Sequence, residues 1–302
     1  MNEVNSLLPK NKRMMSAEFV SKHLFLFACP ICHSSMKVFE LKSLVCSNQH
    51  TFDFAKQGYI NLTTGQIKTK YSKELFEARR TLMTESTFFK PVVETIAKLI
   101  NKEGIQAKKE LSIIDMGCGE GSHLASICDL VSAKGNKKVV GVGIDLAKEG
   151  VVVAAKNYSE NKLWAVADLA RTPFINKQFD VILNILSPSN YAEFNRLLKE
   201  DGLVIKVIPQ TDYLKELRDY FFHETEKQTY SNEETVERFQ DSFRFVDSSR
   251  LRYRDHLNGP LIWPLVQMTP LTWGITDKQA ASFLEKESIE VTIDLEIMIG
   301  RK

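Results

Sequence analysis

The sequence predicts a three-layer α/β fold with a mainly parallel sheet. From about residue 91 onward, short segments rich in Val and Ile alternate with helical segments, a pattern typical of parallel strands buried on both faces. A glycine-rich loop follows the first of these strands, and acidic residues stand at the ends of the next two. The expected strands span residues 111–115, 138–145, 163–167, 179–185 and 202–208, and the helices between them span 122–131, 147–158 and 190–199. Two further strands, 244–254 and 290–300, are expected to finish the sheet and could run antiparallel to it.

Size and composition allow one large soluble domain and one small one. The chain has 302 residues, of which 43% are hydrophobic and 26% charged. No apolar run reaches the length of about 18 residues that a transmembrane helix needs, so no membrane partner is expected. The apolar segment 23–29 is short and lacks a following cleavage site, so no secretory signal is expected and the cytoplasm is the expected location.

Four candidate metal ligands stand close together near the start of the chain. Cys29 and Cys32 have two residues between them, and Cys46 and His50 follow with three between them. Two such pairs suit a tetrahedral zinc ion, and four protein ligands leave no open position, so a structural role is expected. Five cysteines in a reducing compartment also favour metal binding over disulfides. The alternatives are four unrelated residues, a redox pair of Cys29 and Cys32, or His33 as the histidine ligand.

The chain divides into four expected parts. Residues 1–22 show no clear apolar period and are expected to be a flexible lead-in. Residues 23–65 would form the zinc-binding domain, and 66–90 a basic connecting segment with a helix from about Lys73. Residues 91–302 would form the α/β domain.

The net charge is only +2, but basic residues cluster in two places. Either cluster could be a solvated face, and nucleic-acid binding is the alternative. The first cluster, between residues 56 and 80, contains Lys56, Lys68, Lys70, Lys73, Arg79 and Arg80, and the second contains Arg244, Arg250, Arg252 and Arg254.

The glycine-rich loop is the strongest candidate for a ligand site. It follows a strand and precedes a helix, and its glycines let the backbone turn sharply and approach a ligand. Its carboxylates would repel a phosphate but suit the cationic amino-acid end of S-adenosylmethionine. The loop consists of Asp115, Gly117, Gly119, Glu120 and Gly121, with Met116 and Cys118 between them.

Two further acids are placed to hold the rest of a nucleoside. Asp145 ends the next strand, where a carboxylate can accept both ribose hydroxyls. Asp168 follows the third strand, where it could bond an adenine amino group. The alternative is that each caps a helix. Asn184 and Ser187 stand at the end of a later strand, where these residue types also favour a plain turn.

This arrangement of the loop and the acids resembles the class I S-adenosylmethionine-dependent methyltransferases, which have a Rossmann-like fold. A more specific resemblance appears when other segments are added. It is to the bacterial 23S rRNA guanine-N1 methyltransferases of the RlmA type, in particular the Gram-positive branch associated with tylosin resistance. The segments are the four-ligand set, HTFDFAKQGYINL (50–62), EARRTLM (77–83), FKP (89–91), DMGCGEG (115–121) and LVQMTPLTW (265–273).

The resemblance implies a zinc domain that helps to recognise RNA, a methyltransferase domain that uses S-adenosylmethionine, and a homodimer with a cleft for a 23S rRNA hairpin. It assigns zinc to the four ligands named above and cofactor contacts to Gly119 and Glu120. Two further cofactor contacts correspond to Phe89, where relatives have tyrosine, and to Tyr213, where some have histidine.

The implied reaction is methylation of guanine N1 in a hairpin loop. N1 is sealed in a Watson–Crick pair, so the target must be unpaired or flipped out before it reacts. Tyr59, Phe89 or Trp263 could stack on it. In methyltransferases of this fold the loop that corresponds to Asn184 and Ser187 faces the methyl acceptor, so these two residues could orient the Watson–Crick edge of the guanine. Two alternatives are a small-molecule methyltransferase with a structural zinc domain and a non-catalytic RNA-binding zinc protein. The residues indicate no general base.

Overall fold

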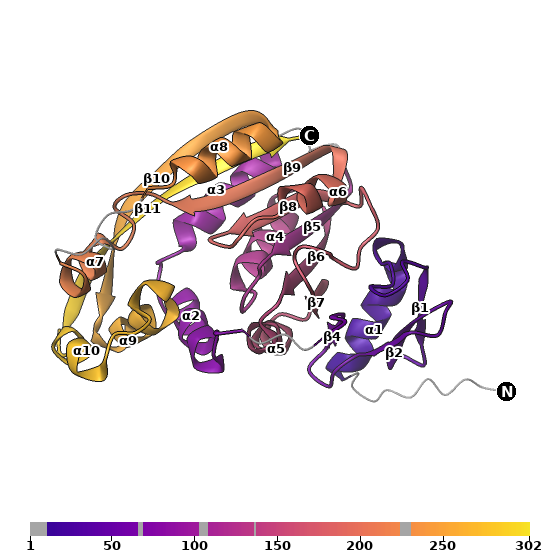
Figure 1. Ribbon diagram of the computed structural model, residues 1–302, viewed down its shortest axis with the longest axis horizontal. Helices are drawn as coiled ribbons and strands as arrows, with labels where there is room; N and C mark the ends of the chain where they lie inside the picture. The colour runs from indigo at the N-terminus through magenta and orange to yellow at the C-terminus, as the bar shows by residue number, and fades with distance from the viewer. Residues whose placement is uncertain (1–10, 66–68, 103–107, 136, 224–230) are drawn as a thin grey trace.

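The computed structural model describes residues 11–65, 69–102, 108–135, 137–223 and 231–302 (Figure 1). Its largest element is a sheet with the strand order β10-β11-β9-β8-β5-β6-β7-β4. The six strands from β9 to β4 run parallel, whereas β11 is antiparallel to β9 and β10 is antiparallel to β11. The expected α/β fold is therefore confirmed. The strands are β4 (Tyr59–Asn61), β5 (Glu110–Met116), β6 (Lys138–Asp145), β7 (Lys162–Val166), β8 (Phe179–Ile185), β9 (Leu198–Pro209), β10 (Arg244–Asn258) and β11 (Ser288–Arg301).

Helices cover both faces of this sheet because its central strands are apolar on both sides. In β5, Ile113 packs into one core and Ile114 into the other, as expected where successive side chains point to opposite faces. One face is covered by α3 (Lys90–Lys102), α4 (Ser122–Gly135) and α5 (Lys148–Asn157), and the other by α6 (Tyr191–Leu197) and α8 (Glu233–Ser242).

The long antiparallel strands β10 and β11 extend beyond the sheet to a group of C-terminal helices (Figure 1). These are α7 (Lys215–Phe221), α9 (Gly259–Met268) and α10 (Asp277–Leu284). The connecting helix α2 (Lys73–Glu85) packs against α9 on one side and α5 on the other. It therefore links the C-terminal helices to the parallel part of the sheet.

The zinc module, which we define as residues 12–55, contains α1 (Lys12–Lys22), β1 (Met36–Phe39), β2 (Ser43–Cys46) and β3 (Thr51–Asp53). The expectation of a flexible lead-in is wrong for 12–22, because Ala17 and Val20 are fully buried on a helix capped by Asn11. The sequence shows only a weak apolar period here because α1 buries a narrow stripe of its surface. Residues 1–10 lie outside the described residues, as do 66–68 of the connecting segment.

The expected boundary at residue 65 also needs adjustment. Strand β4, which follows the zinc module, pairs in parallel with β7 at the edge of the main sheet. The part expected to be a separate zinc domain therefore ends inside the sheet of the α/β domain. Within the described residues, no helix is long and apolar enough to span a membrane.

Candidate cofactor pocket and metal centre

The zinc module brings the four expected ligands together. Their ligand atoms all lie within 4.8 Å of one another. Cys32 Sγ is 3.7 Å from Cys46 Sγ, and Cys46 Sγ is 3.4 Å from His50 Nδ1. A tetrahedral ion with Zn–S bonds of about 2.3 Å places its sulfur ligands roughly 3.8 Å apart, so the set fits zinc. The cysteines are free, and it is His50 that joins the set.

The zinc module is attached to the α/β domain through the connection between β7 and β8. Ala28 N donates to Pro173 O at 3.1 Å, and Ile175 N donates to Leu26 O at 2.9 Å. The rings of Phe27 and Phe174 pack between these two hydrogen bonds. Among the described residues, the connection between β7 and β8 contains no helix. The zinc module covers the part of the sheet face next to this connection instead.

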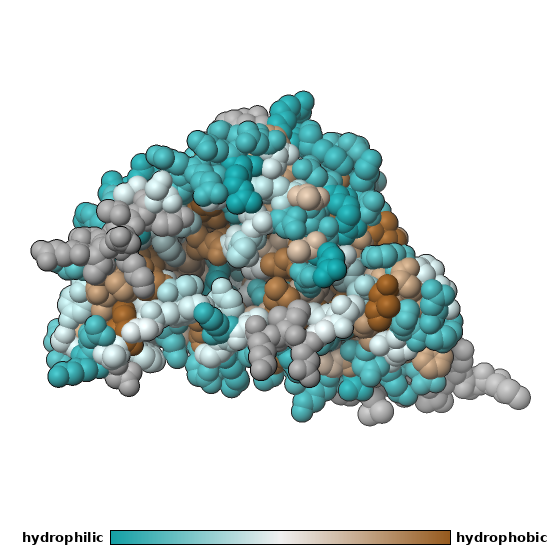
Figure 2. Space-filling model, viewed as in Figure 1, coloured by the Kyte–Doolittle hydropathy of each residue, from teal (hydrophilic) through white to brown (hydrophobic). Residues whose placement is uncertain are grey.

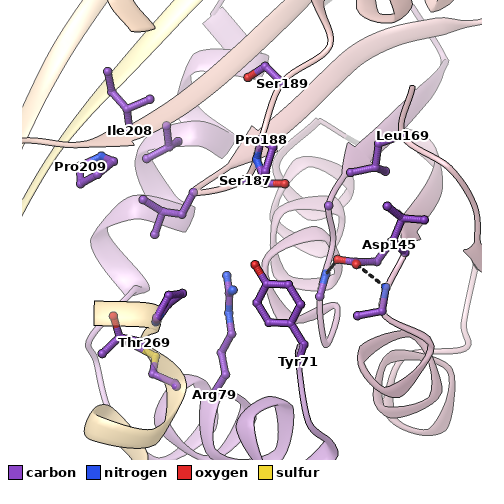
Figure 3. A pocket seen from close by; sticks show the side chains of 18 of the residues that line it. Tyr71, Arg79, Asp145, Leu169, Ser187, Pro188, Ser189, Ile208, Pro209 and Thr269 are labelled. Carbon is purple, nitrogen blue, oxygen red and sulfur yellow. Dashed lines mark hydrogen bonds between the residues drawn. The ribbon is translucent and has the colours of Figure 1, made fainter. Parts of the chain in front are cut away.

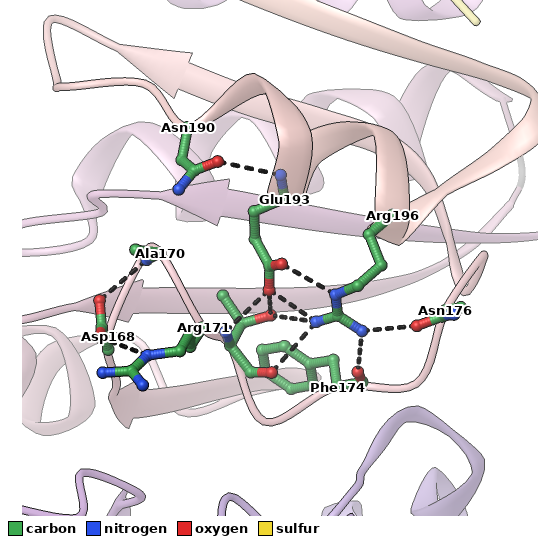
Figure 4. A network of polar contacts seen from close by, with 9 residues as sticks. Asp168, Ala170, Arg171, Phe174, Asn176, Asn190, Glu193 and Arg196 are labelled. Atoms are coloured by element: carbon green, nitrogen blue, oxygen red, sulfur yellow. Dashed lines mark hydrogen bonds and ion pairs between the residues drawn. The ribbon is translucent and has the colours of Figure 1, made fainter.

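A buried ionic network holds the same connection against α6 (Figure 4). Glu193 accepts hydrogen bonds from the backbone and the hydroxyl of Thr172, and also from Arg196. Arg196 donates in turn to Phe174 O at 2.7 Å. Burial opposes ionisation, but these hydrogen bonds outweigh it and lower the pKa of Glu193 below its usual range. The connection is thus held in place between the zinc module and the pocket.

A pocket of about 870 Å³ lies at the carboxyl ends of β5, β6, β8 and β9. It opens where the strand order reverses, between β5 and β8, which is the usual ligand crevice of an open α/β sheet. Its volume lies toward the upper end of the roughly 300–1,000 Å³ found for small-molecule sites, so it can hold more than one ligand group. The space-filling view shows the molecule hollowed in its middle, with hydrophobic surface inside the hollow (Figure 2).

The glycine loop forms one wall of this pocket. Gly117 and Gly119 line it, with φ angles of 94° and 54° in the left-handed region that favours glycine. A Cβ atom on Gly117 would lie only 1.9 Å from Ser187 Oγ. Gly121 packs instead against the Trp164 ring, where a Cβ would lie 2.6 Å from the nearest ring atom. The loop therefore needs glycine both for its backbone and for its neighbours.

Asp145 faces the pocket and also holds the loop in place (Figure 3). Its two carboxylate oxygens accept hydrogen bonds of 2.8 Å from Gly119 N and Ala147 N. Each oxygen retains a second lone pair, so the carboxylate can still accept ribose hydroxyls. Burial raises the pKa of Asp145 above its usual range, although these backbone hydrogen bonds favour the charged form. The ribose assignment and the capping alternative are thus both compatible with the structure.

Asp115 and Glu120 are buried behind the loop, and neither lines the pocket. Burial raises the pKa of Asp115 to about 7, although the charge of Arg79 opposes this. Burial also raises the pKa of Glu120, which accepts a hydrogen bond from Ser122 Oγ. Contact between these two carboxylates and the cofactor stays a prediction. Arg79 does line the pocket, with Nε 3.9 Å from Glu120 Oε1.

Ser187 lines the pocket opposite Arg79, and its contact with the acceptor stays a prediction, whereas Asn184 does not line the pocket. Asn184 is fully buried and donates to Met116 O and Pro188 O. Its oxygen accepts from Ser189 Oγ and from Lys206 Nζ, at 2.9 and 2.7 Å. All its hydrogen-bonding capacity is used to hold the loop, so it does not reach a ligand.

Lys206 is a residue of the site that the sequence reasoning missed. It lines the pocket, is 3% exposed, and donates to Asn184, to Ser189 Oγ and to Ser187 O. Burial lowers the pKa of Lys206 to about 8. A lysine within the otherwise apolar segment 202–208 was the available signal.

The remaining expected site residues lie at different distances from the pocket. Phe89 and Tyr213 line it, and burial raises the pKa of Tyr213. Asp168 does not line it: the carboxylate accepts from Ala170 N at 2.9 Å and lies 3.8 Å from Arg171 (Figure 4). Its neighbour Leu169 lines the pocket instead. Contact between Asp168 and adenine stays a prediction.

Of the three aromatic residues expected to stack on a base, Phe89 lines the pocket and the other two do not. Tyr59 is buried in β4 and Trp263 is exposed on α9, and neither lines the pocket. Tyr71 and Trp273 do line it, with ring centroids 5.3 Å apart. Trp273 ends the segment LVQMTPLTW, which was the available signal for it.

The second basic cluster is largely neutralised by ion pairs. Arg250 is paired with Asp294 at 2.7 Å, Arg252 with Asp212, and Arg254 with Glu290 at 2.8 Å. This favours the interpretation as a solvated face. The first cluster is divided: Lys73 pairs with Glu77 at 3.0 Å, Arg79 enters the pocket, and Lys68 lies outside the described residues.

Together, the sheet order, the glycine loop and the Cys3His centre define a class I S-adenosylmethionine-dependent methyltransferase with a zinc ribbon. Comparison with protein families agrees: the RlmA N-terminal family matches residues 27–73 and the methyltransferase domain family matches 113–202. YxjB of Bacillus subtilis (strain 168), named provisionally as a 23S rRNA (guanine-N1-)-methyltransferase, is 46% identical over 280 residues, which are 92% of this chain and 97% of that protein. The chain therefore belongs to the family of 23S rRNA (guanine-N1-)-methyltransferases of the RlmA type.

More distant relatives extend the match. The 23S rRNA (guanine(748)-N1)-methyltransferase of Streptomyces fradiae is 28% identical over 276 residues, covering 90% of this chain and 95% of that protein. A Micromonospora griseorubida protein with a provisional name for the same class of activity is 24% identical over 287 residues, with the same coverage of both chains.

Proposed function

We propose that this protein methylates N1 of a guanine in a hairpin loop of 23S rRNA, with S-adenosylmethionine as the methyl donor. The observation that carries the proposal is the extent of the similarity. Relatives named as 23S rRNA guanine-N1 methyltransferases align with 90% or more of the chain, and the RlmA N-terminal family matches residues 27–73. The structure supports it with a pocket that has the glycine loop as one wall and is large enough for a second ligand group beside the cofactor.

The residues present fit the cofactor. Gly117 and Gly119 leave room for a ligand against the backbone, and Asp145 offers carboxylate oxygens beside them. When bound, S-adenosylmethionine supplies an activated methyl group on a sulfonium. Methyl transfer of this kind needs little covalent help, so the main task of the chain is to position the two reactants. The loop that carries Ser187, in contact with Gly117, lies where the acceptor would meet the donor.

A second wall of the pocket, formed by Tyr71 and Trp273, suits an unpaired purine. Tyr71 and Trp273 meet at the pocket although they come from distant segments, and they are 39% and 37% exposed. Exposed rings at the mouth of a pocket are available to stack on a base that has left its pair. Ile208, Pro209 and Thr269 also line the pocket.

Trp273→Ala tests the second wall. Base–aromatic stacking contributes about 1–3 kcal/mol per base, so RNA affinity should fall about 5- to 100-fold while S-adenosylhomocysteine binding stays unchanged. Filter binding of the RNA and calorimetry of the cofactor product measure the two effects. Trp263→Ala is the matched control, since Trp263 is 45% exposed but lies outside the pocket. Equal effects of the two substitutions would contradict a stacking role for Trp273.

The reaction itself is tested with labelled S-adenosylmethionine and protein-free 23S rRNA. A methyl group on N1 blocks base pairing, so primer extension should stop at one hairpin-loop guanine, and an isolated hairpin transcript should also be labelled. Asp145→Ala should abolish the stop. Label in small metabolites alone would favour a small-molecule methyltransferase. RNA binding without any transfer would favour a non-catalytic RNA-binding protein.

The resemblance to the RlmA type also supports two finer proposals, a homodimer around the hairpin and a cytoplasmic location. Light scattering coupled to size-exclusion chromatography, with and without the hairpin, should give the mass of two chains. Cell fractionation should recover the protein with the ribosome-containing soluble fraction. A single-chain mass under both conditions would contradict the dimer.

A further inference from the structure

The side chain of Arg79 is the feature of the pocket that the proposed reaction leaves without a role. It comes from α2, in the segment that connects the zinc module to the α/β domain. Its side chain is only 19% exposed and projects into the pocket beside Tyr71, with Ser187 on the other side (Figure 3). Its Nη1 atom lies 3.8 Å from the position that a Cβ on Gly119 would occupy. The guanidinium therefore lies directly against the glycine loop.

This guanidinium has few hydrogen-bond partners among the described residues. Nη2 donates to His123 Nδ1 at 3.2 Å. Burial lowers the pKa of His123 well below its usual range, so the ring is neutral and cannot balance the charge. Nε is buried without a hydrogen-bond partner, because Glu120 Oε1 at 3.9 Å is too distant for one. A guanidinium has five N–H donors, so most remain available to a ligand in the pocket.

The other basic residues of the pocket are engaged or exposed. Lys206 directs its donors to the loop 184–189, Lys70 is exposed, and Arg238 is 66% exposed and close to Glu234. Among the described residues, Arg79 is thus the partly buried guanidinium that faces the space beside the glycine loop. A partly buried cation with unused donors is stabilised by an anion, and a carboxylate matches the guanidinium in a bidentate arrangement.

We propose that Arg79 binds the α-carboxylate of the methionine group of the cofactor. This rests on the proposed function only in that S-adenosylmethionine is the ligand of this pocket. Glu120 and His123 would then hold the guanidinium in position from behind, and Glu120 would act through Arg79 without touching the cofactor itself. The connecting helix α2 would contribute directly to cofactor recognition.

The test pairs a protein change with a matching ligand change. Calorimetry measures the binding of S-adenosylhomocysteine and of its decarboxylated analogue, 5′-deoxy-5′-(3-aminopropylthio)adenosine, which keeps the amine and lacks the carboxylate. Wild-type protein should prefer S-adenosylhomocysteine by about 10- to 100-fold, the range for a hydrogen bond between charged groups. Arg79→Ala should lose that much affinity for S-adenosylhomocysteine and almost none for the analogue, so the preference disappears. Arg79→Lys keeps the charge without the planar fork and should lie between.

Arg80→Ala is the matched control. Arg80 is the next residue of α2, but it lines a separate groove between α2 and α5 and should leave both affinities unchanged. If Arg79→Ala weakens both ligands equally, Arg79 only shapes the pocket and the proposal is wrong, as it is if neither affinity changes. Failure of the wild-type protein to bind either ligand would instead overturn the cofactor assignment. Arg79→Gln, of similar length, repeats the comparison if Arg79→Ala does not fold.

Discussion

Gly117 shows how much one side chain decides at this site. Its backbone has a φ of 94°, and it is so close to the loop 184–189 that a methyl group on it would overlap Ser187. Gly117 thus determines both the backbone path of the glycine loop and how closely this loop packs against the loop 184–189. Lys206 holds the facing loop in place, because its buried ammonium donates hydrogen bonds to three groups of the loop 184–189.

Gly117→Ala should weaken S-adenosylhomocysteine binding by at least about 10-fold, because the left-handed backbone alone costs an alanine about 1–2 kcal/mol and the contact with Ser187 adds to this. Calorimetry measures the loss. Gly65→Ala is the control, since a Cβ there meets nothing within 4 Å. An unchanged affinity in Gly117→Ala would mean that the loop and Ser187 move apart freely.

Lys206→Met should lower the methylation rate while leaving cofactor binding nearly intact. Methionine fills a similar volume but cannot donate, so the loop that carries Ser187 loses its three hydrogen bonds. Displacement of the loop 184–189 should reduce kcat about 10- to 100-fold. Single-turnover kinetics and calorimetry separate the two quantities. A loss in cofactor affinity of the same size would assign Lys206 to the cofactor wall instead.

At the scale of elements, the zinc module behaves as a cover for the sheet. Its buried side chains, Leu26 and Phe27 among them, belong to the same hydrophobic core as Phe174 and Phe179. The chain then enters the main sheet through β4. Zinc should therefore stabilise one face and one edge of the α/β domain, whereas the pocket is lined mainly by α2 and by the carboxyl ends of β5, β6, β8 and β9.

Cys46→Ser should release zinc and raise amide exchange in α1, β1, β2 and β3, while β5, β6 and β8 stay protected. RNA methylation should fall more than S-adenosylhomocysteine binding. Mass spectrometry of hydrogen exchange and a zinc assay measure these effects. Cys128→Ser, a buried cysteine on α4 outside the ligand set, should keep its zinc. Uniform exchange across the whole sheet would show that zinc holds the entire fold.

At the scale of the molecule, the end of the sheet away from the pocket has its own charge cluster. Asp180 at the start of β8 is 1% exposed and accepts from Lys108 and Lys199 at 2.8 and 2.9 Å. Burial opposes the carboxylate, but these hydrogen bonds, with those from Ser112, outweigh it and lower the pKa of Asp180. The cluster joins β5, β8 and β9, so one end of the sheet is tied by charge and the other is left open for ligands.

Asp180→Asn should lower the free energy of unfolding at pH 7 by about 2 kcal/mol, a moderate value because both lysines are about one-third exposed. The pKa is lowered in the folded state, so the stabilisation is present above the unfolded value of about 3.9 and is lost as pH falls below it. Urea unfolding from pH 7 to pH 3 should show the difference from wild type shrinking. Asp201→Asn, which removes an exposed partner of Lys108, should cost under about 0.5 kcal/mol.

Local pattern was enough to predict the α/β fold, the glycine loop and the four-ligand set. Strand and helix periodicity depends on neighbours in the chain, and the zinc ligands lie within 22 residues, from Cys29 to His50. Asp145 was also predictable, because the ends of successive parallel strands meet at one edge of a sheet.

Only the tertiary structure decided which side chains share the pocket. Arg79 reaches the glycine loop, and Tyr71 meets Trp273, across stretches of chain whose sequence does not encode their distance. The same holds for Asn184, whose hydrogen bonds go to Met116 O and Pro188 O, and for Glu120, which is buried beside Arg79 and Ser122. Sequence by itself thus determined the elements and the class of ligand, since these follow from local spacing. The packing of distant helices determined the charges and rings that the ligand meets.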